Sequence, residues 1–133
     1  MEHIQFGYHL RLDFYGCDVE ALSSMDKCYE ALDKLPTVLS MHKLIPPYVI
    51  SADSNENRGG KDPGGYTGFV VIAESHISLH TFAKRGFVSI DVYSCNEFDK
   101  QAATDFLSNI FQPKDIEENF VKRGTRYPVN NIY

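Results

Sequence analysis

The chain has 133 residues, of which 43% are hydrophobic and 23% charged, so the sequence predicts one globular domain with a core of its own. A formal net charge of −5 without a basic run argues against nucleic-acid binding, and no apolar run approaches the roughly 20 residues that cross a membrane. The N-terminal residues lack the features of a signal peptide and the three cysteines form no C-x-x-C pair, so we expect reduced thiols in a cytoplasmic protein.

The first half of the chain is expected to contain two strands, a helix and a long loop. Hydrophobic and polar residues alternate through "YHLRLDFYG", and this period of two predicts a half-buried strand. Asp18 can cap a helix whose apolar stripe runs from Leu22 to Leu32, and Pro36 is expected to end that helix. The segment "TVLSMHKLI" (37–45) predicts a second strand. Residues 46–66 are rich in Pro, Gly, Asn and Asp, which predicts a polar loop long enough to be functional or disordered.

The second half is expected to consist of strands and one helix. Extended segments are predicted at "TGFVVIAES", "HISLHTF" and "GFVSIDVYSC", followed by a helix over "EFDKQAATDFLSNIF" and a last strand around Phe120. This order favours an α+β fold in which helices pack on one face of an antiparallel sheet. Two helices cannot shield both faces, so we expect a homodimer that stacks sheet on sheet.

The segment "ESHISLH" (74–80) concentrates reactive side chains in what is otherwise a buried strand. His76, Ser78 and His80 should point to one face of that strand. Two histidines without a nearby Cys or carboxylate give only weak support for a metal site. A serine hydrolase is also poorly supported, because the glycines of a nucleophile elbow are absent. A plain strand with hydrogen-bonded polar groups stays open as an interpretation.

Ser75 supports a further hypothesis because it lies between two strand-like segments. A serine at a tight turn can attack the carbonyl of the preceding residue, Glu74, and convert the peptide bond into an ester. Loss of the Cα proton then breaks the chain, and the new N-terminus at position 75 becomes a pyruvoyl group. Such a ketone forms a Schiff base with an amine and takes the place of pyridoxal phosphate.

These blocks, "ESHISLHTF…GFVSIDVYSC" with the early "YHLRLDFYGCD", closely resemble the bacterial S-adenosylmethionine decarboxylases. The resemblance implies an α/β sandwich, with four αββα layers in the dimer, for a single decarboxylase domain over residues 1–133. It also implies a proenzyme that cuts itself between residues 74 and 75 into fragments 1–74 and 75–133. The cofactor would be a covalent pyruvoyl group, with no metal and no pyridoxal phosphate, and the implied setting is polyamine biosynthesis.

The resemblance also implies roles for single residues. Ser75 would become the pyruvoyl group that forms the Schiff base, with Glu74 on the other side of the cleaved bond. His80 would help to remove the Cα proton during processing, assisted by the hydroxyl of Thr67, where the family usually has serine. Cys95 would return a proton to the substrate carbon after carbon dioxide leaves.

Two positions depart from the family pattern, and both concern the adenosine half of the substrate. After "HT" the family continues with Trp-Pro-Glu, whose glutamate binds the ribose, whereas this chain has Phe82 and Lys84 in that register. A lysine ammonium only donates hydrogen bonds and cannot replace a carboxylate that accepts them. Leu44 stands where a family phenylalanine stacks on adenine, and it offers no π face.

The departures at the adenosine positions favour a changed amino-acid substrate. L-ornithine or L-arginine keeps the α-amino and carboxylate groups that the chemistry needs, and a loop acid such as Asp53, Glu56 or Asp62 could hold the distal cation. S-adenosylmethionine itself is a nearly equal alternative. A different class of function, an unprocessed and non-catalytic relative that regulates a partner, stays open. Cys17 and Cys28 are expected to be packing residues.

Overall fold

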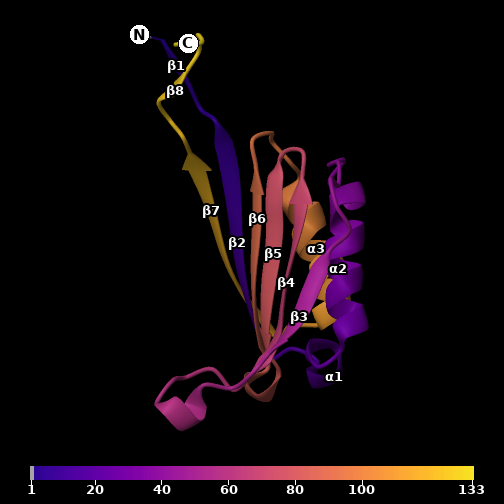
Figure 1. Cartoon of the computed structure of the whole chain (residues 1–133). Coiled ribbons are helices and arrows are strands. Elements are labelled where there is room, and N and C mark those ends of the chain that lie inside the picture. Colours follow the sequence, from indigo (N-terminus) through magenta and orange to yellow (C-terminus); the bar gives the residue numbers. More distant parts are fainter. Residues whose placement is uncertain (1) are drawn as a thin grey trace.

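The segments of alternating polarity build a six-stranded antiparallel sheet in the computed structural model, which describes residues 2–133 (Figure 1). In chain order the elements are β1 His3–Ile4, β2 Gly7–Tyr15, α1 Val19–Leu22, α2 Met25–Val38, β3 Tyr48–Ala52, η1 Glu56–Arg58, β4 Gly65–Ile72, β5 Ser75–Phe82, η2 Ala83–Arg85, β6 Phe87–Ser94, α3 Lys100–Phe111, β7 Asp115–Arg123 and β8 Tyr127–Pro128. The sheet order is β3-β4-β5-β6-β2-β7, and β1 pairs only with β8. The predicted α+β class is confirmed.

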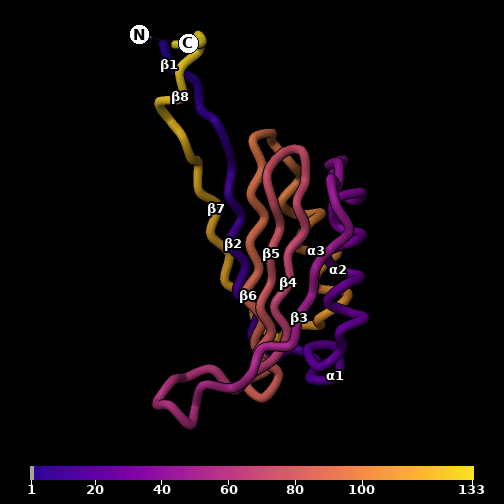
Figure 2. The backbone as a smooth tube through the Cα atoms, in the orientation of Figure 1, coloured from indigo at the N-terminus to yellow at the C-terminus, as the bar shows by residue number. Residues whose placement is uncertain are grey.

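Helices α2 and α3 cover one face of the sheet (Figure 2), and the core lies between these helices and the sheet. The strand residues of this face are fully or nearly fully buried: Leu10, Leu12, Phe14, Val70, Ile72, Ile77, Leu79, Val88, Ile90 and Val92. Burying each side chain of this size contributes about 1.5–3 kcal/mol relative to leaving it in water. The strict alternation in β5 and β6 follows from this one-sided packing, because every second side chain must face the helices.

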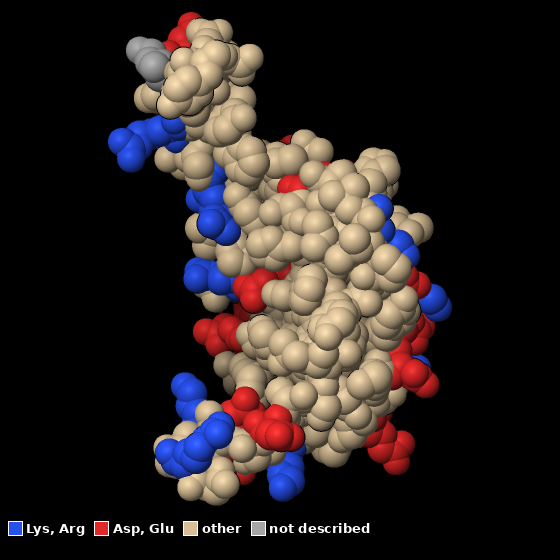
Figure 3. All heavy atoms as spheres, in the orientation of Figure 1, with Lys and Arg blue, Asp and Glu red and all other residues tan. Residues whose placement is uncertain are grey.

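No element of the described residues 2–133 covers the opposite face of the sheet, which we call the open face. Its central positions carry polar and aromatic side chains: His9, Arg11, Asp13, Thr67, His76, Ser78, His80, Ser89, Asp91 and Tyr93. Figure 3 shows acidic and basic side chains along the β7 edge, on the loop that carries η1 and over α2, with few across the middle of the view. The expected uncovered face is therefore present.

Three sequence predictions about the first half of the chain are wrong in detail. The helix after Asp18 is broken in two, because Ser24 caps a new helix by accepting a hydrogen bond from the backbone N–H of Lys27. Pro36 does not end α2 but lies in its last turn, two residues before the helix ends at Val38. The predicted strand 37–45 is therefore mostly helix end and connection, and the real strand, β3, lies within the predicted loop 46–66.

Two segments project beyond the body of the sheet (Figure 1). The loop between β3 and β4 swings away from the helices at one end, and the ribbon of β1 and β8 continues β2 and β7 at the other. Among the described residues, no helix is long and apolar enough to span a bilayer.

Candidate active site

The predicted cleavage site lies at the two-residue turn that joins β4 to β5. Glu74 is the second residue of this turn, and Ser75 is the first residue of β5. The neighbouring strand β6 places Ser94 opposite Ser75, so Cys95 comes next to the turn. The backbone N–H of Cys95 donates a 2.9 Å hydrogen bond to the carbonyl oxygen of Glu74. The structure therefore brings together three residues that the sequence singled out.

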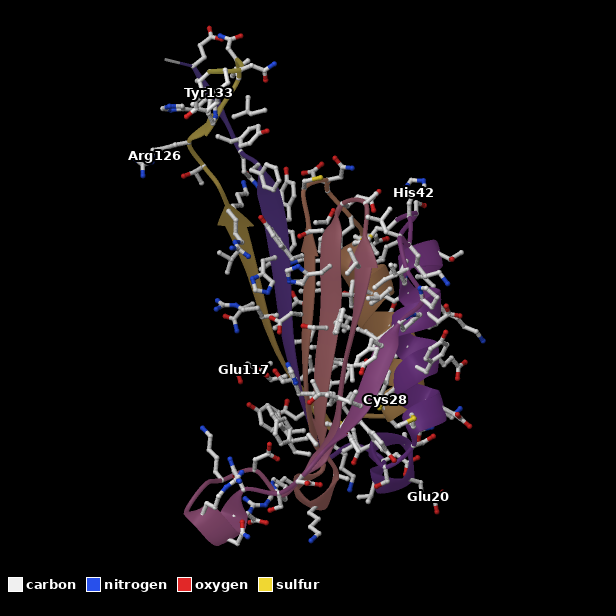
Figure 4. The ribbon with its side chains drawn as sticks, in the orientation of Figure 1. Glu20, Cys28, His42, Glu117, Arg126 and Tyr133 are labelled. Atoms are coloured by element: carbon white, nitrogen blue, oxygen red, sulfur yellow. The ribbon has the colours of Figure 1, made fainter. Side chains whose placement is uncertain are left out.

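The side chain of Glu74 is held by a residue that sequence reasoning did not select. Glu74 Oε1 accepts a hydrogen bond from the backbone N–H of His42 at 3.1 Å, and Oε2 lies 2.8 Å from His42 Nδ1. Burial opposes ionisation of this carboxyl, yet the hydrogen bonds from His42 outweigh it and leave the pKa of Glu74 below its ordinary value. His42 follows α2 at the same end of the sheet as the β4–β5 turn (Figure 4). No spacing rule links it to Glu74, 32 residues further on.

His76, one of the two histidines weighed above as metal ligands or as polar residues of a plain strand, lies beside Ser75. The hydroxyl of Ser75 lies 3.3 Å from Nδ1 of His76. His76 packs edge-on against Tyr93, with ring centroids 5.5 Å apart, on the open face. Ser75 is therefore at the rim of the sheet with its hydroxyl in reach of the open face.

The predicted processing pair lies further along the same two strands. Thr67 of β4 is opposite His80 of β5, and the threonine Oγ1 lies 3.2 Å from His80 Nδ1. Ser89 of β6 follows in the same row, and it pairs in turn with Asp13 of β2. Burial raises the pKa of Asp13, a hydrogen bond from Ser89 opposes the rise, and the nearby carboxylates of Glu117 and Asp91 add to it.

His80 does not meet Ser75 within one chain. Five residues separate them on β5, and a strand rises roughly 16 Å over that length. The site therefore divides into a cleavage end, which comprises Glu74, Ser75, Cys95 and His42, and a processing end, which comprises the row of Thr67, His80, Ser89 and Asp13.

The three predicted substrate contacts are also divided between the two ends. Leu44 lies near the cleavage end: its backbone N–H donates to the carbonyl of Val71, and the residue is 62% exposed. Phe82 follows the processing end and packs against Phe87, with ring centroids 5.5 Å apart. Lys84 lies in η2 and lines a cavity of about 380 Å³ together with loop residues. One chain does not bring Leu44 to Phe82 or Lys84.

Two of the three acidic side chains proposed to hold a substrate cation are engaged by other groups of the protein. Glu56 forms a 2.6 Å ion pair with Arg85. The side chain of Asp62 accepts a hydrogen bond from the backbone N–H of Gly64 at 2.8 Å. Asp53 lines the same cavity as Lys84. Two of the three proposed partners for a distal substrate cation are thus already bonded.

The cysteines differ in their surroundings. Burial raises the pKa of the Cys17 thiol to about 11 and that of Cys28 to about 12, which suits packing residues. Cys95 is partly exposed beside Ser75. Within residues 2–133 no group of three His, Cys, Asp or Glu side chains is arranged to hold a metal ion.

Comparison with known proteins gives matches over most of the chain. The family model described as S-adenosylmethionine decarboxylase matches residues 8–124. The S-adenosylmethionine decarboxylase proenzyme of Sulfurihydrogenibium sp. is 30% identical over 125 residues, which are 93% of this chain and 86% of the relative. The proenzyme of the same name from Pyrobaculum neutrophilum is 36% identical over 119 residues, 89% of each chain.

A solved structure gives a match of similar extent. The crystal structure of the adenosylmethionine decarboxylase from Aquifex aeolicus superposes with a TM-score of 0.76 at 27% sequence identity. The match covers 96% of this chain and 98% of the other. The two proenzymes are named as decarboxylases of S-adenosylmethionine, and the solved structure as a decarboxylase of adenosylmethionine.

Proposed function

The chain belongs to the S-adenosylmethionine decarboxylase family, and we propose on this basis that it is a self-processing, pyruvoyl-dependent decarboxylase of S-adenosylmethionine. Family membership confirms the predicted enzyme class, a decarboxylase. The initial preference for L-ornithine or L-arginine is not supported by the names of the relatives. It also loses physical support because Glu56 is paired with Arg85 of η2 and Asp62 bonds to the backbone of its own loop.

The observation that carries the proposal is the hydrogen bond from the Cys95 N–H to the Glu74 carbonyl. A donor at this oxygen withdraws electrons from the carbonyl carbon and stabilises the negative charge that forms there during attack. When Ser75 Oγ attacks, a C–O bond forms, the C–N bond breaks, and the hydroxyl proton ends on the freed amine of Ser75. The peptide bond has then become an ester.

Chain cleavage follows by elimination at position 75. A base removes the Cα proton, the Cβ–Oγ bond breaks, and the first fragment leaves with the carboxylate of Glu74. The dehydroalanine left at position 75 takes up water and releases ammonia, which leaves a pyruvoyl group. His80 is the proposed base, with the Thr67 hydroxyl 3.2 Å from its Nδ1 to orient the ring.

The residues around position 75 fit a pyruvoyl group at this place. Its chemistry is to accept the substrate amine and to draw electrons away from the Cα–carboxylate bond while carbon dioxide leaves. Cys95, partly exposed next to the turn, is placed to deliver a proton to the substrate carbon afterwards.

A face-to-face homodimer would unite the two ends of the site. The distance of roughly 16 Å along β5 keeps His80 from its own Ser75. A two-fold axis across the open face turns one sheet end for end over the other, so the processing end of one copy comes to the cleavage end of its partner. The same arrangement would place Leu44 of one copy near Phe82 and Lys84 of the other. Two sheets with outer helices form the predicted αββα layers.

The first experiment measures self-cleavage and carbon dioxide release on the same preparation. Intact mass should show fragments 1–74 and 75–133 in place of one 15.1 kDa chain. Purified protein is then offered S-adenosylmethionine, L-ornithine and L-arginine in parallel, and release from S-adenosylmethionine is expected. Release from ornithine or arginine alone would overturn the assignment of S-adenosylmethionine as the substrate. An uncut chain that releases carbon dioxide from none of the three substrates would support the unprocessed, regulatory relative.

A further inference from the structure

His42 is well placed to act on the bond that the proposed function cleaves. Both oxygens of the Glu74 carboxylate contact His42, one through the backbone N–H at 3.1 Å and one at Nδ1 at 2.8 Å. The carbonyl of His42 also accepts a 2.8 Å hydrogen bond from the backbone N–H of Ala73. Both residues of the β4–β5 turn are therefore tied to one residue outside the sheet hairpin.

The exposure of the two partners is strongly unequal. The Glu74 side chain is only 9% exposed, whereas the His42 side chain is 77% exposed. A carboxylate so little exposed keeps its charge at a cost unless donors compensate it. Since an ionised carboxylate only accepts hydrogen bonds, Nδ1 of His42 must carry the proton that is shared with Oε2.

The side chain of His42 is not needed to anchor its own segment. Lys43 forms an isolated bridge with Ile72 of β4, and its ammonium group pairs with Asp33 of α2. The backbone N–H of Leu44 donates to the carbonyl of Val71 at 2.9 Å. These contacts hold residues 43 and 44 against the sheet edge, so the His42 imidazole is available to hydrogen-bond Glu74 in the β4–β5 turn.

We infer that His42 is a positioning residue for self-cleavage, which fixes Glu74 so that its carbonyl meets the Cys95 N–H and the Ser75 hydroxyl together. The inference rests on the proposed function. It has an electrostatic part as well, because negative charge develops on the Glu74 carbonyl oxygen during attack. A free carboxylate of the same residue would oppose that charge in a poorly solvated place. Hydrogen bonds from His42 to both carboxylate oxygens compensate part of that charge.

The test compares self-cleavage rates of His42→Ala and His42→Asn with that of the unaltered chain. The amide nitrogen of asparagine can occupy the place of Nδ1, whereas alanine removes this donor and leaves the backbone donor in place. We expect His42→Ala to cleave roughly three- to tenfold more slowly, since one exposed charge-assisted hydrogen bond is lost. His42→Asn should recover most of the rate. His3→Ala, at an exposed histidine of the terminal ribbon, is the matched control and should cleave normally.

Two further measurements separate the possible outcomes. The thermal midpoint is compared in an uncut Ser75→Ala background, where His42→Ala should lower it only slightly because the backbone N–H of residue 42 still donates to Glu74. Equal cleavage rates for His42→Ala and the unaltered chain would overturn the inference, as would a His42→Asn rate no better than that of His42→Ala. An unaltered chain that never cuts itself would refute the proposed function instead, and the inference with it.

Discussion

At the cleavage end of β5, backbone and side-chain donors fix both the carbonyl and the carboxylate of Glu74, whereas at the processing end His80 and Thr67 contact each other through side chains alone. The first arrangement suits acyl transfer, which needs a carbonyl held in one orientation. The second suits proton transfer, which needs a base that can approach a hydrogen on another group. Position along one strand thus separates two kinds of chemistry that the reaction must combine.

The largest effect expected is the loss of all cleavage on removal of the nucleophile. Ser75→Ala leaves the Glu74 carbonyl polarised by the Cys95 N–H but with no oxygen to attack it. The chain should run as one 15.1 kDa species by intact mass and release no carbon dioxide. Ser78→Ala, on the same strand, is the control and should be cut. Cleavage that survived Ser75→Ala would remove the pyruvoyl assignment.

The next effect tests whether the two ends belong to different copies. Ser75→Ala and His80→Ala chains should each stay uncut when expressed alone. Co-expressed with different tags, they should form mixed dimers in which Ser75 of one chain faces His80 of the other. The His80→Ala chain, which keeps Ser75, should then be cut in these dimers, as mass spectrometry of the two tagged species would show. A pair that stayed wholly uncut would contradict the shared site.

Loss of the proposed proton donor should separate cleavage from turnover. Cys95→Ala keeps the backbone N–H that bonds to Glu74, so cleavage should proceed at least in part. Carbon dioxide release should fall by roughly 10²- to 10⁴-fold, the range for loss of a positioned acid. Cys17→Ala, at a buried packing position, should keep both self-cleavage and carbon dioxide release. Full turnover by Cys95→Ala would assign the proton to another group.

Much of the sheet could be predicted because its burial is one-sided. In β5 the apolar Ile77 and Leu79 alternate with His76 and Ser78, and this pattern is visible in the sequence. Strand β3 was missed for the opposite reason. It lies at the edge of the sheet with Tyr48 and other apolar side chains exposed, so its sequence shows no buried period.

The candidate site could be predicted only as far as local sequence carries it. A motif selects Ser75, His80 and Cys95 as candidates, and the pairing of Thr67 with His80 follows from strand register. His42 could not be found, because its contact with Glu74 depends on how the connection after α2 returns to the sheet edge. The path of this connection is set by tertiary packing, which leaves no pattern in the local sequence.

The smallest effect distinguishes the two ends by the sign of their pH dependence. The pKa of Glu74 is lowered, so its stabilising contribution is complete above the ordinary pKa of a glutamate, about 4.3, and is lost as pH falls through the folded-state pKa. The pKa of Asp13 is raised, so its ionisation costs stability above the raised value, and this cost vanishes below about 3.9.

Urea unfolding of the uncut Ser75→Ala chain, from about pH 3.5 to 7, measures both contributions. At the upper end of this range Glu74→Gln should lower the free energy of unfolding and Asp13→Asn should raise it. Each change should stay below about 1 kcal/mol, because solvent screens both the partly exposed Asp13 and the exposed His42 that bonds to Glu74. The Asp13→Asn gain should increase with protein concentration, since a face-to-face dimer would desolvate Asp13 further. Changes of the same sign would show that the electrostatic contrast between the cleavage end and the processing end is wrong.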